Sequence, residues 1–379
     1  MINAKDFLAA LEVTDIRFIT GVPDSLLSDV SAEAMATCAA NRHVIAANEG
    51  AAIGLAVGHY LATGRPALVY LQNSGLGNAV NPLVSLADPA IYGVPMILLL
   101  GWRGELRADG GQLADEPQHV VQGQITLKQL ALMGIPYLIL DGESDIRASV
   151  AAAANQAAAG SHPVALVARR HTFPGGRPQA DCDTTLPSRE QSIAAVIAAL
   201  PGDIPVVATT GMASRELFEL RAAAEAGHHR DFLTVGGMGH AISIATGIAL
   251  ARPERKVLCL DGDGAMLMHL GALTTSGAQP NIMHVILNNA AHDSVGGQPT
   301  AAARLDLTDI ARSCGYTLAL MADHVDRIAS AMARLLEQTG SSLLDIRCRK
   351  GARTGLGRPT RTPAENKRDF IAFLAEMSP

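Results

Sequence analysis

Short apolar runs alternate with longer, alanine-rich stretches along almost the whole chain. The apolar runs, which we expect to be strands, occupy residues 15–20, 43–46, 67–71, 96–100, 137–140 and 164–167, and then 205–208, 232–235, 256–260, 282–287 and 343–346. Helices are expected at residues 25–38, 49–63, 126–133 and 144–159, and then at 189–200, 212–221, 239–250, 265–276 and 323–338. Apolar strands that alternate with helices are typical of parallel sheets covered on both faces. The sequence therefore predicts an α/β protein with doubly wound parallel sheets.

The alternation is interrupted between residues 171 and 187. This stretch contains three prolines and two glycines, and no hydrophobic period crosses it. A chain of 379 residues is long enough for two or three domains. We therefore predict one α/β domain at residues 1–170, a linker at 171–187 and a second α/β domain at 188–379.

Composition excludes several classes of protein. Apolar residues make up 48% of the chain and charged residues 17%, which is a globular composition. The net charge of −6 provides no general attraction to nucleic acid or to an anionic membrane. No segment runs for about 18 apolar residues without glycine or charge, and Lys5 and Asp6 interrupt the N-terminal apolar residues. We therefore expect neither a membrane span nor a secretory signal.

The cysteines also argue against secretion. The five cysteines are odd in number and far apart, at Cys38, Cys182, Cys259, Cys314 and Cys348. They form neither a disulfide framework nor a Cys-x-x-Cys metal motif. We therefore expect a reduced, cytoplasmic protein.

The most informative segment joins a buried strand to a helix through Gly262-Asp263-Gly264. Backbone N–H groups and the helix dipole at such a turn form a seat for a diphosphate. Asp263 adds a hard oxygen ligand, and the next predicted strand ends in Asn288-Asn289 at the same edge of the sheet. Carboxylate, amide and backbone oxygens could together bind a Mg²⁺ ion that also binds phosphate oxygens.

Other interpretations of this segment are weaker. The chain has no G-x-x-x-x-G-K-[ST] motif, and the turn lacks the third glycine of a dinucleotide fingerprint. A tight turn with a helix-capping aspartate, or a loop with two asparagines, would explain either piece alone. The two pieces at one sheet edge favour the diphosphate site.

These residues resemble the cofactor motif of the thiamine diphosphate-dependent decarboxylases. The resemblance implies that Asp263 and Asn289 are side-chain ligands of Mg²⁺ and that the backbone carbonyl of Ala291 is a third ligand. It also places Gly262, Gly264 and Ala265 at the cofactor. The loop Gly237-Met238-Gly239-His240 resembles the upstream diphosphate loop of this family, in which the side chain of Met238 would support the bent cofactor.

In the first domain, Asn48-Glu49-Gly50 follows a predicted strand and opens a helix of small residues. A glutamate in the first turn of a helix is also favoured by the helix dipole alone. The small residues leave room for a second backbone or subunit, at Ala51, Ala52, Gly54, Ala56 and Gly58. The family resemblance implies that Glu49 binds pyrimidine N1′ of the cofactor and promotes deprotonation at C2.

The chain has no room for the third, central domain that many members of this superfamily carry. Its length resembles that of the compact phosphonopyruvate and sulfopyruvate decarboxylase families. Stretches that resemble the former family lie at residues 21–25, 72–78, 101–105, 115–119, 210–217 and 292–298. This resemblance implies decarboxylation of 3-phosphonopyruvate to phosphonoacetaldehyde and CO₂, with sulfopyruvate decarboxylation or carboligation as the alternatives.

Decarboxylation of a 2-oxo acid requires an acid near the reacting carbon. Asp24 at a strand-to-helix turn, and His119 and His292 in predicted loops, are the candidates. A phosphonate or sulfonate tail requires local donors, and the nearest plausible set is Ser25, Asn78, Arg103 and His119. Packing of Arg103 beside Trp102 is the structural alternative for that arginine.

Residues 347–368 carry eight basic residues and one acidic residue. A solvated tail or a nucleic-acid contact would explain this charge, but the run has no aromatic residue for base stacking. The family resemblance suggests instead that the segment packs near the active-site mouth. It also implies at least a homodimer, in which the first domain of one chain faces the second domain of its partner and two active sites are shared.

Two functions of other classes remain as alternatives. An α/β hydrolase would use Ser74 as its nucleophile, but the residue two positions before it is Gln72, where the nucleophile elbow requires glycine. A cofactor-binding or scaffold protein without activity would be favoured if Glu49 or Asp263 were replaced by an inert residue. Both residues are present.

Overall fold

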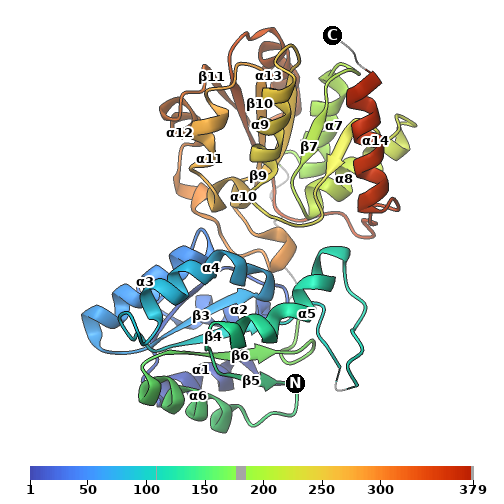
Figure 1. Cartoon of the computed structure of the whole chain (residues 1–379). Helices are drawn as coiled ribbons and strands as arrows, with labels where there is room; N and C mark the ends of the chain where they lie inside the picture. The colour runs from blue at the N-terminus through green and yellow to red at the C-terminus, as the bar shows by residue number, and fades with distance from the viewer. Residues whose placement is uncertain (108, 176–184, 377–379) are drawn as a thin grey trace. The chain divides into compact units, whose positions relative to one another are not determined.

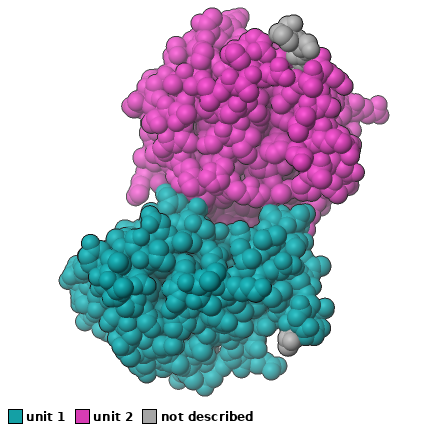
Figure 2. Space-filling model, in the orientation of Figure 1, with its two compact units in different colours: residues 1–178 teal, residues 179–379 magenta. Residues whose placement is uncertain are grey.

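The computed structural model describes residues 1–107, 109–175 and 185–376. The chain divides into two compact units, Met1–Pro178 and Gln179–Pro379 (Figure 2). Residues 176–184 of the predicted linker, and Cys182 with them, lie outside the described residues. We describe each unit by itself.

The first unit contains a six-stranded parallel sheet (Figure 1). In the order β2-β1-β3-β4-β6-β5, its strands are His43–Ile45, Phe18–Gly21, Ala67–Gln72, Met96–Gly101, Pro163–Ala168 and Tyr137–Leu140. Its helices are α1 (Ala4–Val13), α2 (Ser28–Thr37), α3 (Glu49–Thr63), α4 (Leu76–Pro82), α5 (Pro117–Leu132) and α6 (Ile146–Gly160). Helices α1, α2 and α6 contribute to the core on one face of the sheet, and α3, α4 and α5 to the core on the other.

The second unit repeats this architecture with a second six-stranded parallel sheet. In the order β11-β12-β10-β9-β7-β8, its strands are Leu318–Ala322, Ser342–Arg347, Ile282–Asn288, Val257–Gly262, Val206–Ala208 and Asp231–Leu233. Its helices are α7 (Arg189–Ala199), α8 (Met212–Ala223), α9 (Ala241–Ala251), α10 (Asp263–Met268), α11 (Ala272–Ser276), α12 (Leu307–Ser313), α13 (Val325–Glu337) and α14 (Pro363–Glu376). Helices α7, α8 and α13 line one face, and α9, α11 and α12 the other. The predicted class, two doubly wound parallel-sheet domains, is confirmed.

Local interactions fix the ends of several helices. Asn48 caps α3 because its Oδ1 accepts a hydrogen bond from the backbone N–H of Ala51 at 2.9 Å. Ser188 and Gln191 form a reciprocal capping box at the start of α7. Gly64 ends α3 with a φ of 70°, in the left-handed region that favours glycine.

Several predicted bounds are wrong. Helix α5 begins at Pro117, nine residues before the predicted start at 126, because a proline is well tolerated in the first turn. The predicted helix 265–276 is two helices, since the backbone leaves the helical region at His269. The sequence did not indicate α1, α4, α12, α14 or β11. Strand β11 lies at the edge of its sheet, and its half-exposed Met321 weakens the apolar pattern.

The basic C-terminal stretch is not a solvated tail throughout. It ends in α14, whose Phe370 and Phe373 are buried and whose Asn366 bonds to the backbone at both ends of β8. Arg353 pairs with Glu190 and Glu219 in the segment before that helix. These ion pairs occupy charge that a nucleic-acid contact would need.

Among the described residues, no helix is long and apolar enough to cross a membrane. Within the same part of the chain, the cysteines are free thiols, at Cys38, Cys259, Cys314 and Cys348.

Candidate active site

The first cluster of polar side chains lies at the carboxyl ends of the strands in the first unit. Asp24 follows β1, Glu49 follows β2, Gln72 ends β3 and Arg103 follows β4. Parallel strands bring their carboxyl ends to one edge of the sheet, where ligands of α/β proteins bind. The topology therefore gathers residues that are up to 79 positions apart in the sequence, as Asp24 and Arg103 are.

Glu49 is the first residue of α3 and is only 6% exposed. Its Oε2 accepts a hydrogen bond from Asn78 Nδ2 at 2.7 Å. A side chain at Gly75 would place its Cβ 2.5 Å from Glu49 Oε1, so that glycine makes room for the carboxyl group. Burial raises the pKa of Glu49, although the hydrogen bond from Asn78 partly offsets this effect. The raised pKa favours the protonated carboxyl group, which suits a residue that exchanges a proton.

Asn78 was predicted as a substrate residue, but its amide is bonded to Glu49. Asn78 lies in the stretch 72–78, which resembles the phosphonopyruvate decarboxylase family. That resemblance does not show which side chain Asn78 contacts. This bond holds the Glu49 carboxyl group in one orientation, and contact of Asn78 with the substrate stays a prediction.

Asp24 is completely buried beside the end of β4. Its Oδ1 accepts a hydrogen bond from Gln72 Nε2 at 2.7 Å, and its Oδ2 accepts one from the backbone N–H of Leu26 at 3.1 Å. Burial raises the pKa of Asp24, and the bond from Gln72 only partly counters it. Ser74 donates to Gln72 Oε1 at 2.7 Å. An amide oxygen is not a general base, so the contact gives no support to the hydrolase alternative.

The side chain of Arg103 binds polar partners and does not serve mainly to pack against Trp102. Its Nε donates to Asp115 Oδ2 at 2.8 Å, its Nη2 bonds to the other oxygen of that carboxylate, and its Nη1 donates to Ser25 Oγ at 3.2 Å. Instead it is Arg169 that lies over the Trp102 ring, at 5.3 Å. The structure thus brings the predicted substrate residues Ser25 and Arg103 together, with Asp115 as an unforeseen partner.

The prediction that His119 lies in a loop is wrong, because the residue belongs to the first turn of α5. It is buried, and its Nδ1 has no hydrogen-bond partner among the described residues. Burial and the nearby Arg103 lower the pKa of His119 to about 4. The imidazole is therefore neutral at neutral pH and is a poor proton donor.

The second cluster lies at the carboxyl ends of β9 and β10 in the second unit. Asp263 begins α10 and is 2% exposed. Its carboxylate accepts hydrogen bonds from the Thr300 hydroxyl and from backbone N–H groups that include that of Asn289. Burial nevertheless raises the pKa of Asp263 to about 7, because no cationic side chain is among these partners.

Asn289 and Ala291 form a tight turn after β10. Asn289 Oδ1 accepts a hydrogen bond from the backbone N–H of Ala291 at 3.0 Å, and Ala290 has a φ of 54°. The backbone N–H of Asn289 bonds to the Asp263 carboxylate, so the two predicted ligands lie together. A buried carboxylate without a cationic partner, next to amide and carbonyl oxygens, suits a hard divalent cation. These residues therefore fit the Mg²⁺ and diphosphate that the sequence predicted.

The loop Gly237-Met238-Gly239-His240 lies against α10. Gly239 has a φ of 88°, and a Cβ on it would lie 3.1 Å from the Ala265 carbonyl oxygen. His240 stacks on His269 with ring centroids 4.4 Å apart. The structure thus places both predicted diphosphate loops side by side.

His292 follows this turn and lies against Gly264, since a Cβ there would be 3.1 Å from His292 Cε1. Burial lowers the pKa of His292 to about 4, so this imidazole is also neutral at neutral pH. Both candidate histidines therefore lose support as cationic acids.

A buried polar chain supports the Gly262 turn from within the core. Asp261 Oδ1 accepts a hydrogen bond from the backbone N–H of Gly262 at 2.9 Å, and its Oδ2 faces His284 Nε2 at 3.4 Å. His284 in turn approaches the Tyr316 hydroxyl at 3.3 Å. These contacts could not be predicted from the sequence, because the residues belong to two strands and a loop that are far apart along the chain.

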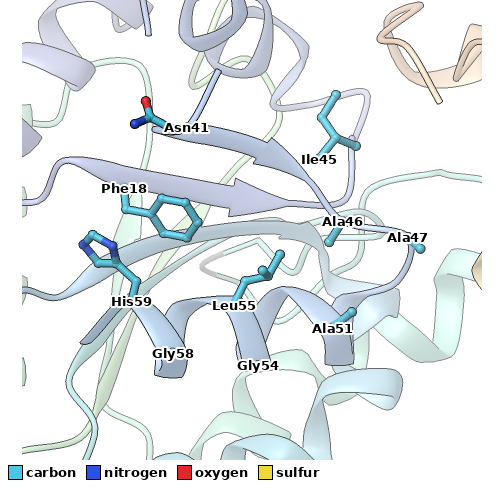
Figure 3. Close-up of a pocket in the computed structure, with 10 residues that line it drawn as sticks. All are labelled: Phe18, Asn41, Ile45, Ala46, Ala47, Ala51, Gly54, Leu55, Gly58 and His59. Atoms are coloured by element: carbon cyan, nitrogen blue, oxygen red, sulfur yellow. The ribbon is translucent and has the colours of Figure 1, made fainter. Parts of the chain in front are cut away.

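The small-residue face of α3 borders an open groove of about 730 Å³ (Figure 3). Phe18 and Ile45 line its sheet side, and Ala51, Gly54 and Leu55 line its helix side. The groove contains neither Glu49 nor Asp24. It is therefore separate from the cluster of polar groups described above.

Known protein families match both parts of the chain that carry the polar clusters. The N-terminal thiamine pyrophosphate binding domain of the thiamine pyrophosphate enzymes matches residues 2–132, and the C-terminal binding domain matches residues 209–346. The first range includes Glu49, and the second includes Asp263 and Asn289.

Two curated relatives match along almost the whole chain. A phosphonopyruvate decarboxylase from Streptomyces viridochromogenes is 35% identical, with 99% of this chain and 95% of the relative covered. One from Streptomyces hygroscopicus is 34% identical, with 100% and 96% covered. A sulfopyruvate decarboxylase from Methanosarcina acetivorans is 29% identical, with 69% and 70% covered. The chain therefore belongs to the thiamine pyrophosphate enzymes and, within them, to the family of the phosphonopyruvate decarboxylases.

Proposed function

We propose that this protein decarboxylates 3-phosphonopyruvate to phosphonoacetaldehyde and CO₂ with thiamine diphosphate and Mg²⁺. The observation that carries the substrate is the similarity to two phosphonopyruvate decarboxylases over nearly the full length of each chain. The sulfopyruvate decarboxylase is less similar and matches a smaller share of this chain. Sulfopyruvate is therefore the second candidate substrate.

The two polar clusters have distinct tasks in this proposal. When bound, thiamine diphosphate supplies an electron sink for the carbanion that loss of CO₂ leaves. Asp263, Asn289 and the carbonyl of Ala291 hold the metal ion, and the loop at residues 237–240 holds the diphosphate. Glu49 binds the pyrimidine ring and exchanges a proton at its own carboxyl group, for which its buried, Asn78-bonded position is suitable.

Asp24 is our choice of proton donor to the reacting carbon. Its pKa is raised by burial, whereas burial lowers the pKa values of His119 and His292 to about 4. A raised pKa favours the protonated carboxyl group, which is the form that can donate a proton. The neutral histidines remain available as hydrogen-bond donors to substrate oxygens.

Arg103 and Ser25 are our candidates for contact with the phosphonate. Nη1 of Arg103 points to Ser25, so guanidinium and hydroxyl donors converge. Asp115 occupies the other edge of the guanidinium and keeps it in this orientation.

The substrate proposal is tested by comparing CO₂ release from 3-phosphonopyruvate and from sulfopyruvate under identical conditions. We expect the higher kcat/KM with 3-phosphonopyruvate and phosphonoacetaldehyde as the product. A higher kcat/KM with sulfopyruvate would assign the alternative substrate. Condensed products that contain a second carbonyl substrate would instead indicate a carboligase.

We further propose that the active unit is at least a homodimer, with each site built from two chains. Glu49 and Asp263 belong to different units, and the small-residue face of α3 leaves room for a neighbour. Glu49→Gln protein and Asp263→Ala protein, each inactive alone, should then recover activity when their subunits exchange. Equal mixing gives about a quarter of wild-type activity, because each hybrid dimer has one intact site. Continued inactivity after demonstrated exchange would contradict the shared site.

A further inference from the structure

Asp293 carries a largely buried carboxylate to which none of the interpretations above assigns a role. It begins the short 3₁₀ turn η3 (Asp293–Val295), four residues after Asn289, and its side chain is 9% exposed. Its Oδ2 accepts hydrogen bonds from Asn289 Nδ2 at 2.6 Å, Arg189 Nη1 at 2.9 Å and the backbone N–H of Gly351 at 2.9 Å. Three elements of the second unit therefore meet at one oxygen atom.

The contact with Asp293 fixes which end of the Asn289 side-chain amide faces the carboxylate. Only the oxygen end of an amide binds a hard cation, and a carboxylate paired with a guanidinium can only accept hydrogen bonds. Asn289 must therefore turn its Nδ2 toward Asp293, which leaves Oδ1 at the opposite end of the amide. That oxygen lies beside the backbone N–H of Ala291, within the turn that also bonds to Asp263.

A buried ion pair holds Asp293 in place. Arg189 donates through Nε and Nη2 to the two oxygens of Glu216, at 2.8 and 2.9 Å, and through Nη1 to Asp293. Arg189 is 6% exposed and Glu216 is 1% exposed. One guanidinium thus serves two carboxylates, which leaves a net negative charge next to the turn and favours a cation there.

We propose that Asp293, held by Arg189 and Glu216, is a positioning residue that orients the Asn289 amide so that its oxygen binds Mg²⁺. The inference rests on the metal site in the proposed function and adds the group that controls one of its ligands. Supporting residues behind metal ligands commonly tune affinity in this way.

Asp293→Asn tests this role with little change in volume. The new amide can donate as well as accept, so it no longer dictates which end of Asn289 faces the metal. We expect the Kd for Mn²⁺, measured by electron paramagnetic resonance with thiamine diphosphate present, to rise about 10- to 100-fold. The melting temperature of the Asp293→Asn apoprotein should stay close to that of the control variant, Asp345→Asn.

Asp345→Asn is the matched control. Asp345 Oδ1 accepts a hydrogen bond from the neighbouring Asn288 Nδ2 at 2.9 Å, the same contact at an asparagine that is not a proposed ligand. A second variant exchanges the pair, with Asn289→Asp and Asp293→Asn combined. A carboxylate offers oxygen at both ends, so this exchange should restore Mn²⁺ affinity to near the wild-type value.

The outcomes separate this inference from the metal site itself. If Asp293→Asn and Asp345→Asn bind Mn²⁺ equally well, or if the exchange restores no affinity and lowers the melting temperature, Asp293 has only a structural role and the inference is overturned. If Asp263→Ala loses Mn²⁺ while Asp293→Asn keeps it, the metal site stands and the role of Asp293 falls. If the wild-type protein binds no Mn²⁺ with thiamine diphosphate present, both fail.

Discussion

Glu49→Gln is expected to keep most of the affinity for thiamine diphosphate and to lower kcat by at least about 100-fold. Glutamine preserves the size of the side chain and can still bind to Asn78, but it cannot exchange a proton. The buried position of Glu49 makes the loss large, because water cannot replace the carboxyl group readily. Calorimetry gives the cofactor affinity, and steady-state CO₂ release gives kcat.

Glu105→Gln provides the control for this variant. Glu105 is also 6% exposed and lies in the same unit, but its carboxylate bonds to Arg169 and to the backbone N–H of Arg170. Its kcat should stay close to the wild-type value at a temperature where both variants are folded. Nearly wild-type turnover in Glu49→Gln, or an equal loss in both variants, would remove the proposed role.

Asp263→Ala is expected to abolish measurable binding of thiamine diphosphate in the presence of Mg²⁺. The loss should exceed the about 10- to 100-fold decrease in metal affinity that follows from removal of a supporting residue. The carboxylate is buried without a cationic side chain, and its pKa is raised to about 7 by that burial. In the proposed function this carboxylate is a ligand of the metal ion, so its removal should prevent metal-dependent binding of the diphosphate.

Asp345→Ala is the comparison for Asp263→Ala. Both aspartates are buried in the second unit, but Asp345 bonds to Asn288 and Arg347 and belongs to no predicted site. We expect calorimetry to show cofactor affinity in Asp345→Ala and none in Asp263→Ala. Unchanged affinity in Asp263→Ala would show that the metal-site assignment is wrong.

The central strands could be predicted because they are buried on both faces. Strands such as β3, β4 and β10 are mostly apolar and almost entirely buried, and their positions agree closely with the predicted runs. Helix α14 was not predicted because the segment was interpreted from its basic residues. Its two buried phenylalanines, Phe370 and Phe373, were not recognised as core residues. Charge pattern alone does not show which side of such a segment faces the sheet.

Some residues of the candidate site could be predicted from the sequence, and others could not. Glu49, Asp263 and Asn289 each lie in a short local pattern, a strand followed by a turn, so the sequence indicates them. Asp115 and Thr300 are recognisable only once the fold brings them to Arg103 and Asp263. The low pKa values of the two histidines also depend on burial, which no local pattern records.

The most direct test of this account is reconstitution of the apoprotein with 3-phosphonopyruvate as the substrate. CO₂ release is measured with thiamine diphosphate alone, with Mg²⁺ alone, with both and with neither, after removal of metal by a chelator. We expect turnover only when both are present, because the proposed function has the diphosphate held through the metal ion at Asp263 and Asn289. Full turnover without thiamine diphosphate, or no turnover of this substrate when both are supplied, would contradict the account.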